Sequence, residues 1–344
     1  MSNESWRPKL HVAPHDGSIS DPNGLCQFKG TYHFFCQNAP TYPPDVDSPH
    51  GWGHFASRDL VNWTFLGCHI MPDFPGDRDG AYSGGAYINE DTDEAWFYYT
   101  GNVRDGVGDG TYSGRDANQT LMKSYNGINM GQKQVVLDNS GYPAYCSNHV
   151  RDPKVWEQDG ALHMLLGARV TPQRGAVLLY KSDDGRSWEL EGSATNRDEA
   201  QLGYMWECPN VVQLPDKDGQ IREFLFVCPQ GVPKQPFKFQ NIHNCGYFPV
   251  EGKVIDLTKE KVHDVILHGI VHDNSSSTTT DIYYVSDVAY AWGTDHLIED
   301  CSHTSNSRLT IPVTVSGNTM QWYGNSAHFQ RNLSGVTYHY TALG

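Results

Sequence analysis

The sequence has little positive charge and no long apolar run. Lys and Arg number 25 against 40 Asp and Glu, which gives a net charge of −15 over 344 residues. Because a phosphate backbone requires a basic surface, binding to nucleic acid is not expected. No stretch approaches the roughly 18 apolar residues of a membrane span, and the N-terminal residues contain no apolar signal segment. We therefore expect a cytoplasmic protein without a nucleic-acid or membrane partner.

Motifs for metals, nucleotides and disulfides are also lacking. The 8 cysteines are scattered without Cys-x-x-Cys spacing, so in a cytoplasmic protein we expect reduced thiols. His263, His268 and His272 fit no common zinc spacing, and no acidic or cysteine partner completes a set. The glycine-rich stretch 106–110 is not followed by the Lys-Ser/Thr of a phosphate-binding loop. The sequence therefore predicts no metal site.

Short apolar and aromatic runs are abundant instead. Aromatic residues make up 12% of the chain, and Gly (34) and Pro (19) are frequent. The runs at 31–35, 95–100, 162–166 and 223–227 are each bounded by Gly, Asp, Asn or Pro. Such lengths and compositions are typical of β-strands separated by turns. We predict an all-β protein.

One pattern occurs twice along the chain. Ser57-x-Asp59-x-x-x-Trp63 matches Ser182-x-Asp184-x-x-x-Trp188 in residue type and spacing, and Ser124 lies between them in a similar context. A strand, a turn and a second strand repeated at such intervals indicate the blades of a β-propeller. The alternative is a pair of ordinary hairpins that share turn chemistry.

Three acidic residues stand close to prolines. Asp21 and Asp152 directly precede a proline, and Glu207 precedes one by two positions. Proline holds the preceding residue in an extended conformation and favours strand starts and edges. In a radially repeated fold, three such side chains would converge at the centre, whereas a single Asp-Pro more often marks a turn.

Paired carboxyl groups are the arrangement that glycoside hydrolysis requires. One ionised group attacks or stabilises the anomeric carbon, and one protonated group donates to the leaving oxygen, about 5–5.5 Å away in retaining enzymes. The two groups must differ in environment. We expect Glu207, next to Met205 and Trp206, to lie in the drier place, and Asp21, among Ser, Asn and Gly, to be the ionised nucleophile.

The three acidic motifs resemble those of a known enzyme family. Asp21-Pro22-Asn23-Gly24, Arg151-Asp152-Pro153-Lys154 and Glu207-Cys208-Pro209 are similar to the three signatures of glycoside hydrolase family 32, the β-fructofuranosidases. Further similar stretches are 7–11, 34–40, 51–63, 79–84 and 99–101. The resemblance spans about residues 7 to 260.

The resemblance implies a five-bladed β-propeller with its active site in the axial funnel. Asp21 would be the nucleophile, Glu207 the acid and base, and Asp152 the stabiliser of the transition state, assisted by Arg151. The positions expected to line the fructose subsite are Asn23, Gln37, Trp52, Tyr82 and Ser83. Trp52, between two glycines, is expected to be a stacking platform. The implied substrates are sucrose and short fructo-oligosaccharides, with no cofactor, and the oligomeric state is open.

The chain also departs from the family. The usual Trp-Met-Asn before the first Asp-Pro is Ser18-Ile19-Ser20 here, so a hydroxyl replaces an amide. The family's Asp-Phe-Tyr-Ala motif of the fifth blade is not recognisable within 262–308. We expect a propeller over 7–315 with an atypical fifth blade, and 316–344 as a remnant of a linker and of a C-terminal β-sandwich that is largely missing.

The sequence leaves other functions open as alternatives. A related propeller could act on another sugar, as an arabinanase-like enzyme does. An altered fifth blade could leave a catalytically silent sugar-binding propeller, and the same residues could serve a fructosyltransferase. The choice between sucrose, its 6-phosphate and fructan is open, although the acidic net charge argues against a phosphorylated substrate unless a local Lys or Arg reverses it.

Overall fold

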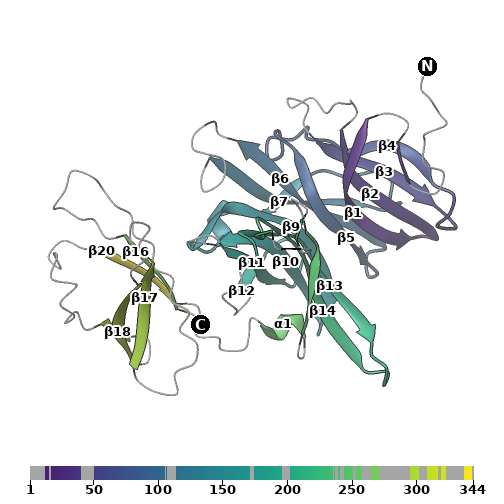
Figure 1. Cartoon of the computed structure of the whole chain (residues 1–344). Coiled ribbons are helices and arrows are strands. Elements are labelled where there is room, and N and C mark those ends of the chain that lie inside the picture. The colour runs from purple at the N-terminus through teal and green to yellow at the C-terminus, as the bar shows by residue number, and fades with distance from the viewer. Residues whose placement is uncertain are drawn as a thin grey trace.

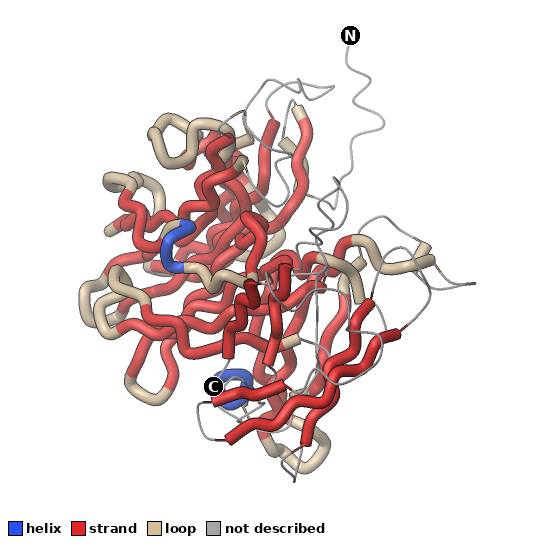
Figure 2. The backbone as a smooth tube through the Cα atoms, turned by 90° about the vertical axis from the view of Figure 1, so that its left-hand side faces the viewer, coloured by secondary structure: helices blue, strands red, loops and turns tan. Residues whose placement is uncertain are grey.

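The structure is a computed structural model of the whole chain. It describes residues 12–14, 17–39, 50–104, 106, 114–170, 174–195, 202–234, 236, 239–240, 244–250 and 253–255 with their side chains. It describes the backbone alone for 256–257, 265–270, 295–301, 308–316, 319–322 and 337–342. Strands dominate the described residues, and the helices among them are the short turns η2 (Asn139–Gly141) and α1 (Val254–Leu257) (Figure 2).

Four antiparallel sheets make up most of the described chain (Figure 1). The first contains β1 (Ser18–Phe28), β2 (Thr31–Ala39), β3 (Gly51–Ser57) and β4 (Thr64–Ile70), and the second β5 (Ala81–Asn89), β6 (Glu94–Arg104), β7 (Arg115–Ser124) and β8 (Gln134–Leu137). The third contains β9 (Cys146–Gln158), β10 (Ala161–Val170), β11 (Arg174–Ser182) and β12 (Glu189–Ala194), and the fourth β13 (Met205–Pro215), β14 (Ile221–Gln230) and β15 (Gly246–Pro249). In each sheet the strands pair in chain order, as in propeller blades.

The first strand of each sheet faces the neighbouring sheets. Strand β5 contacts β1 on one side and β9 on the other, and β9 also contacts β13. Successive sheets are therefore joined through their first strands, which is the arrangement of propeller blades around an axis. The predicted all-β, propeller-like fold is confirmed for these four sheets.

The C-terminal strands form two smaller sheets. Strand β16 (Val265–Ile270) pairs with β20 (Thr337–Ala342), and β17 (Asp295–Cys301), β18 (Arg308–Ser316) and β19 (Thr319–Trp322) form the other sheet. Neither is a four-stranded meander of the blade type, so the count of five blades stays a prediction. The expected boundary at 315/316 and the sandwich remnant also stay predictions, because 271–294, 302–307, 317–318 and 323–336 lie outside the described residues.

The repeated Ser-x-Asp pattern forms the same turn in two blades. The Ser57 hydroxyl accepts the amide of Leu60 at 2.9 Å, and the Asp59 carboxylate accepts the amide of Asn62 at 2.7 Å. Ser182 and Asp184 accept the amides three residues further on at 2.8 and 2.7 Å. Each turn joins the third strand of a blade to the fourth, and Ser124 begins the corresponding connection in the second blade. The sequence repeat therefore marks a structural repeat.

Aromatic side chains fill the spaces between the blades. Phe35 and Trp52 of the first sheet pack with Phe97 and Tyr99 of the second in one buried cluster. The other two clusters lie between the second and third sheets and between the third and fourth. Burial of apolar surface contributes about 25 cal/mol per Å², so these interfaces stabilise the packing of flat sheets on one another. The aromatic content of the sequence is explained by this packing.

A group of three histidines lies inside the first blade. His33 Nδ1 and His54 Nε2 share a hydrogen bond of 2.9 Å, and the ring of Phe35 stacks on His54 with 4.0 Å between ring centroids. His54 is 0% exposed, and its ring meets that of His69 edge-on. Burial, followed by the neighbouring His69 and His33, lowers the pKa of His54 to about 3. The folded state therefore holds His54 neutral.

This burial predicts a loss of stability in mild acid. The unfolded chain takes up the His54 proton below about pH 6.5, while the folded state does so only near pH 3. The free energy of unfolding should therefore fall as pH drops below 6.5, with about 2 kcal/mol from His54 between about pH 7 and 5. Urea unfolding across this range measures it.

The variant His54→Leu should have a shallower slope of unfolding free energy against pH than the original chain. His50→Leu is the matched control, because His50 is exposed, and it should keep the original slope. An unchanged slope in His54→Leu contradicts the prediction, whatever the absolute stability of that variant.

Candidate active site

Asp21 lies on the first strand of the first blade. The pairing of β1 with β2 is irregular on both sides of it, between Ile19 and Pro22 and again between Asn23 and Cys26, and such bulges redirect side chains. The Asp21 carboxylate is exposed, and the hydroxyl of Ser83 donates to its Oδ2 at 3.3 Å. Asp21 is therefore a carboxylate open to solvent and oriented by the second blade.

Asp152 lies on the first strand of the third blade and is only 4% exposed. Its φ is +65°, a conformation that is uncommon outside glycine and clusters at functional sites. Its amide donates to Thr100 Oγ1 at 3.0 Å. Its Oδ2 accepts the amide of Cys208 at 2.8 Å, and the sulfur of Cys208 lies 3.6 Å from the same oxygen. A buried carboxylate needs such donors to offset the loss of hydration.

Glu207 lies on the first strand of the fourth blade. The β13–β14 pairing shifts register between Glu207 and Asn210, and Cys208 has a φ of +47°. Arg151 binds Glu207 Oε1 through Nη2 at 2.8 Å and through Nε at 3.3 Å. Strand β13 approaches β10 very closely here, since a Cβ atom on Gly167 would lie 1.9 Å from the carbonyl oxygen of Trp206.

The structure brings the second and third acidic motifs into direct contact. Arg151 Nε lies 3.8 Å from Asp152 Oδ2 and contacts Glu207 at the same time. Burial raises the pKa of Asp152 to about 6, against the opposing charge of Arg151 and the amide of Cys208. The negative charges of Glu207 and Asp21 raise it further. The three predicted catalytic carboxyl groups therefore form one electrostatically connected group.

The three carboxyl groups lie in different environments. Glu207 is half-buried, with a side chain that is 18% exposed and binds Arg151, whereas Asp21 is exposed, so Glu207 lies in the drier place of the two as expected. The Asp152 side chain, at 4% exposed, is drier than both, which the sequence did not indicate. Asp152 is covered because the amide of Cys208 from the fourth blade and Thr100 from the second blade contact it.

The expected subsite residues are mostly held by main-chain groups of the second blade. Gln37 is buried and donates to the carbonyl of Ala81 at 3.0 Å. Asn23 is also buried and accepts the amide of Gly84 at 3.1 Å. Ser83 is buried beside Asp21, and the half-buried Tyr82 follows Ala81 on the same strand. Their contacts with a substrate stay a prediction.

Trp52 does not present an open face. It is 0% exposed, and its indole nitrogen donates to the carbonyl of Tyr82 at 2.9 Å. Its ring packs edge-on against Tyr99. The expectation of a stacking platform is not met in this structure, because the ring of Trp52 is buried in the cluster between the first and second blades. The indole of Trp52 therefore holds the main chain of Tyr82 through this hydrogen bond.

Two features of the site have no signal in the motifs. The amide of Cys208 donates a hydrogen bond to Asp152. In the sequence, only the position of Cys208 within the motif Glu207-Cys208-Pro209 indicates that it lies near the site. Arg115 begins β7, and its guanidinium lies over the Tyr82 ring, 5.8 Å from the centroid. Within the described part of the chain, the buried Arg115 Nε has no hydrogen-bond partner and no carboxylate forms an ion pair with this side chain.

Among the side chains that the structure describes, no three His, Cys, Asp or Glu residues are grouped so that they could hold a metal ion. No helix in the described part of the chain is long and apolar enough to cross a membrane.

Residues 11–316 match the family model of the glycosyl hydrolases family 32 N-terminal domain. The chain is 36% identical to a sucrose-6-phosphate hydrolase of Bacillus subtilis (strain 168) over 254 residues, which cover 72% of this chain and 49% of that protein. It is 37% identical to a sucrose-6-phosphate hydrolase of Klebsiella pneumoniae, over 79% of this chain and 54% of that protein. The chain thus spans about half the length of the curated relatives it matches.

Solved structures with the same fold support this family match. The structure of sucrose-6-phosphate hydrolase from Lactobacillus gasseri has a TM-score of 0.64 at 25% identity and covers 94% of this chain and 64% of that one. A Bombyx mori GH32 beta-fructofuranosidase mutant in complex with sucrose has the same fold, with a TM-score of 0.61 at 24% identity over 94% of this chain and 66% of that one. On its motifs, its blades and these similarities, the chain belongs to glycoside hydrolase family 32.

Proposed function

We propose that this chain is a retaining β-fructofuranosidase that cleaves the β-fructofuranosyl bond of sucrose or a closely related short oligosaccharide. The observation that carries the proposal is the contact network of Arg151, which binds Glu207 at 2.8 Å and lies beside Asp152, whose carboxylate accepts the amide of Cys208. The names of its relatives, sucrose-6-phosphate hydrolase and raffinose invertase, support a sucrose-type substrate.

The proposed reaction is a double displacement. The exposed carboxylate of Asp21 attacks the anomeric carbon of the fructosyl unit, while Glu207 gives its proton to the departing glycosidic oxygen. Glu207 then takes a proton from water, and the hydroxide oxygen replaces Asp21 on the anomeric carbon. The hydrogen bond from Ser83 orients Asp21 for the attack.

Asp152 is proposed to bind fructose hydroxyl groups as an anion. Its buried position makes each hydrogen bond to it stronger than one made in water. The Cys208 amide and Arg151 hold it in place. Arg151 is proposed to keep Asp152 and Glu207 at a fixed separation as the charge of Glu207 changes during the reaction.

An assay of sucrose cleavage separates this function from its alternatives. Equal release of free glucose and fructose is expected for a hydrolase. Excess free glucose would indicate transfer of the fructosyl unit to another sugar, and no release would contradict the proposed activity and leave sugar binding alone.

Removing either reacting carboxyl should abolish turnover without unfolding the chain. Asp21→Asn removes the nucleophile, and Glu207→Gln removes proton transfer, which contributes about 10²–10⁴-fold to rate. We expect at least that loss in the kcat of each variant for sucrose. An aryl fructoside, whose leaving group needs little protonation, should lose far less with Glu207→Gln than with Asp21→Asn.

The matched controls for these variants are Asp218→Asn and Glu189→Gln, because both side chains are exposed and lie outside the site. They should keep normal turnover. Near-normal sucrose cleavage by either site variant, with the fold verified by circular dichroism, would remove that residue from the proposed role.

The pKa of Asp152 predicts an acidic limit of activity. Since its carboxyl is protonated below about pH 6 and only the ionised form accepts two sugar hydroxyls, kcat/KM should fall as pH drops through that value. The pH profile of kcat/KM for the free enzyme measures this. In Asp152→Asn the residual activity should lack this acidic limb, and retention of the limb would assign it to another group.

Arg115 bears on the choice between sucrose and its 6-phosphate. The net charge of the chain disfavours an anionic substrate, but this guanidinium is not neutralised by an ion pair within the described residues and lies beside Tyr82. Burial lowers the pKa of Arg115, and the nearby charges of Arg151 and Arg104 act in the same direction. We propose that an anionic group of the substrate is accommodated here, outside the fructose subsite.

The variant Arg115→Met tests this preference. A hydrogen bond to a charged group contributes about 1.5–3 kcal/mol, so KM for sucrose 6-phosphate should rise about 10–100-fold while KM for sucrose changes little. Arg186→Met, which removes an exposed arginine of the third blade, is the matched control and should leave both values unchanged. Equal changes for both substrates would argue against a phosphate contact.

A further inference from the structure

Three thiols lie in a row across the fourth blade. Glu207 pairs with Cys228 in the β13–β14 register, which places Cys208 beside Cys228 at the bulge. Val227 pairs with Gly246 in the β14–β15 register, so the next antiparallel pair is Cys228 with Cys245. Cys228 therefore lies between Cys208 and Cys245 on neighbouring segments.

The row connects the catalytic group with solvent. Both neighbouring thiols, Cys208 on one side and Cys245 on the other, act to lower the pKa of Cys228. The sulfur of Cys208 also lies 3.6 Å from Asp152 Oδ2. Cys208 and Cys228 are half-buried and Cys245 is exposed. A change at the exposed end can therefore reach Asp152 through two sulfur contacts.

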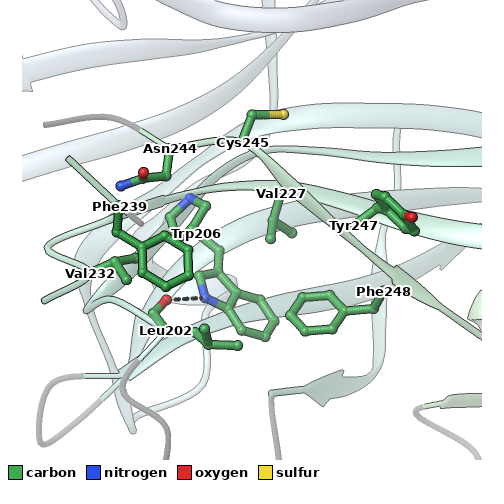
Figure 3. Close-up of a pocket in the computed structure, with 11 residues that line it drawn as sticks. Leu202, Trp206, Val227, Val232, Phe239, Asn244, Cys245, Tyr247 and Phe248 are labelled. Atoms are coloured by element: carbon green, nitrogen blue, oxygen red, sulfur yellow. Dashed lines mark hydrogen bonds between the residues drawn. The ribbon is translucent and has the colours of Figure 1, made fainter. Parts of the chain in front are cut away.

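Cys245 is exposed and also borders a small cavity. Cys245 lines a cavity of about 140 Å³ together with Trp206, Val227 and Phe248 (Figure 3). Trp206 immediately precedes Glu207, and its indole nitrogen donates to the carbonyl of Leu202 at 2.8 Å. The cavity thus lies behind the strand that carries Glu207.

The pKa of Cys228 is lowered, whereas the pKa values of Cys208 and Cys245 in the same row are raised. The hydrogen bond with Cys208 lowers the pKa of Cys228 to about 7, although burial opposes this. In contrast, burial raises the pKa of Cys146 far above its usual range. Since the thiolate is the reactive form of cysteine, the lowered pKa favours Cys228 over Cys146 as the attacking thiol.

We propose that Cys228 and Cys245 form an oxidation site for hydrogen peroxide, whose disulfide lowers the activity of the neighbouring catalytic group. The Cys228 thiolate attacks one peroxide oxygen, the O–O bond breaks, and a sulfenic acid forms with release of hydroxide. The Cys245 sulfur then attacks the Cys228 sulfur, an S–S bond forms, and the sulfenic oxygen leaves as water with the thiol proton. The two thiols lose two electrons, and one peroxide becomes two waters.

The disulfide changes the contacts of Asp152. Once bonded to Cys245, Cys228 can no longer accept the thiol proton of Cys208 as a thiolate, and it is drawn toward Cys245. The amide and the sulfur of Cys208 both contact Asp152. Cys208 then loses its interaction with Cys228 on its opposite side. The loss of activity rests on the proposed function, whereas formation of the disulfide does not.

Peptide mapping after peroxide treatment tests the site directly. The full chain is treated with hydrogen peroxide, free thiols are blocked, and disulfide-linked peptides are identified by mass spectrometry. We expect a Cys228–Cys245 link that dithiothreitol reverses. Cys146→Ser is the matched control and should form the same link. Absence of the link, or a link between Cys208 and Cys228 in its place, would overturn the proposed pair.

Activity measured in the same samples tests the consequence. Sucrose cleavage should fall at least fivefold on oxidation and return with dithiothreitol, each variant being compared with its own untreated activity. Cys245→Ser should not show this reversible loss. Formation of the disulfide without loss of activity would overturn the proposed effect on the catalytic group but not the oxidation site. A chain that is inactive before treatment would count against the proposed function alone.

Discussion

The hydrogen bond between the Cys208 amide and the buried Asp152 carboxylate is the contact on which the site depends. A carboxylate that is 4% exposed is costly unless donors replace its water. The donors come from the fourth blade and from the adjacent Arg151. This requirement fixes β13 against β9, and it thereby places Glu207 within reach of the Arg151 guanidinium. The relative position of the Arg151-Asp152 and Glu207-Cys208 motifs therefore follows from the burial of the Asp152 carboxylate.

Close packing of the blades makes this contact attainable. The blades approach at glycines, where a Cβ atom would meet main-chain atoms of the next blade. On Gly167 it would lie 1.9 Å from the Trp206 carbonyl oxygen, and on Gly85 it would lie 3.3 Å from the Pro153 carbonyl oxygen. Around these points, buried aromatic clusters hold successive sheets together. As a result Asp152 is dry and Asp21 is exposed, and the two lie close enough for the charge of Asp21 to raise the pKa of Asp152.

Local patterns were sufficient to predict much of the fold. The Ser-x-Asp turns could be predicted because their hydrogen bonds join residues only two or three positions apart. The strand runs were visible for the same reason, since alternation and turn residues are local properties. The count of blades is not local, because it depends on how the C-terminal strands pair, and β16 pairs with β20 across a long stretch of chain.

The sequence by itself determined that the protein is built from β-strands, where its turns fall, and which three acidic residues stand beside prolines. Only the tertiary structure decided that Asp152 rather than Glu207 is the driest carboxyl, that Trp52 is covered, and that Arg115 faces Tyr82 without a neutralising partner in the described chain. The row of three thiols is a result of the same kind. Strands and turns depend on residues that are close together in the sequence. Burial and electrostatic environment depend on neighbours on other sheets, which are many positions away in the chain.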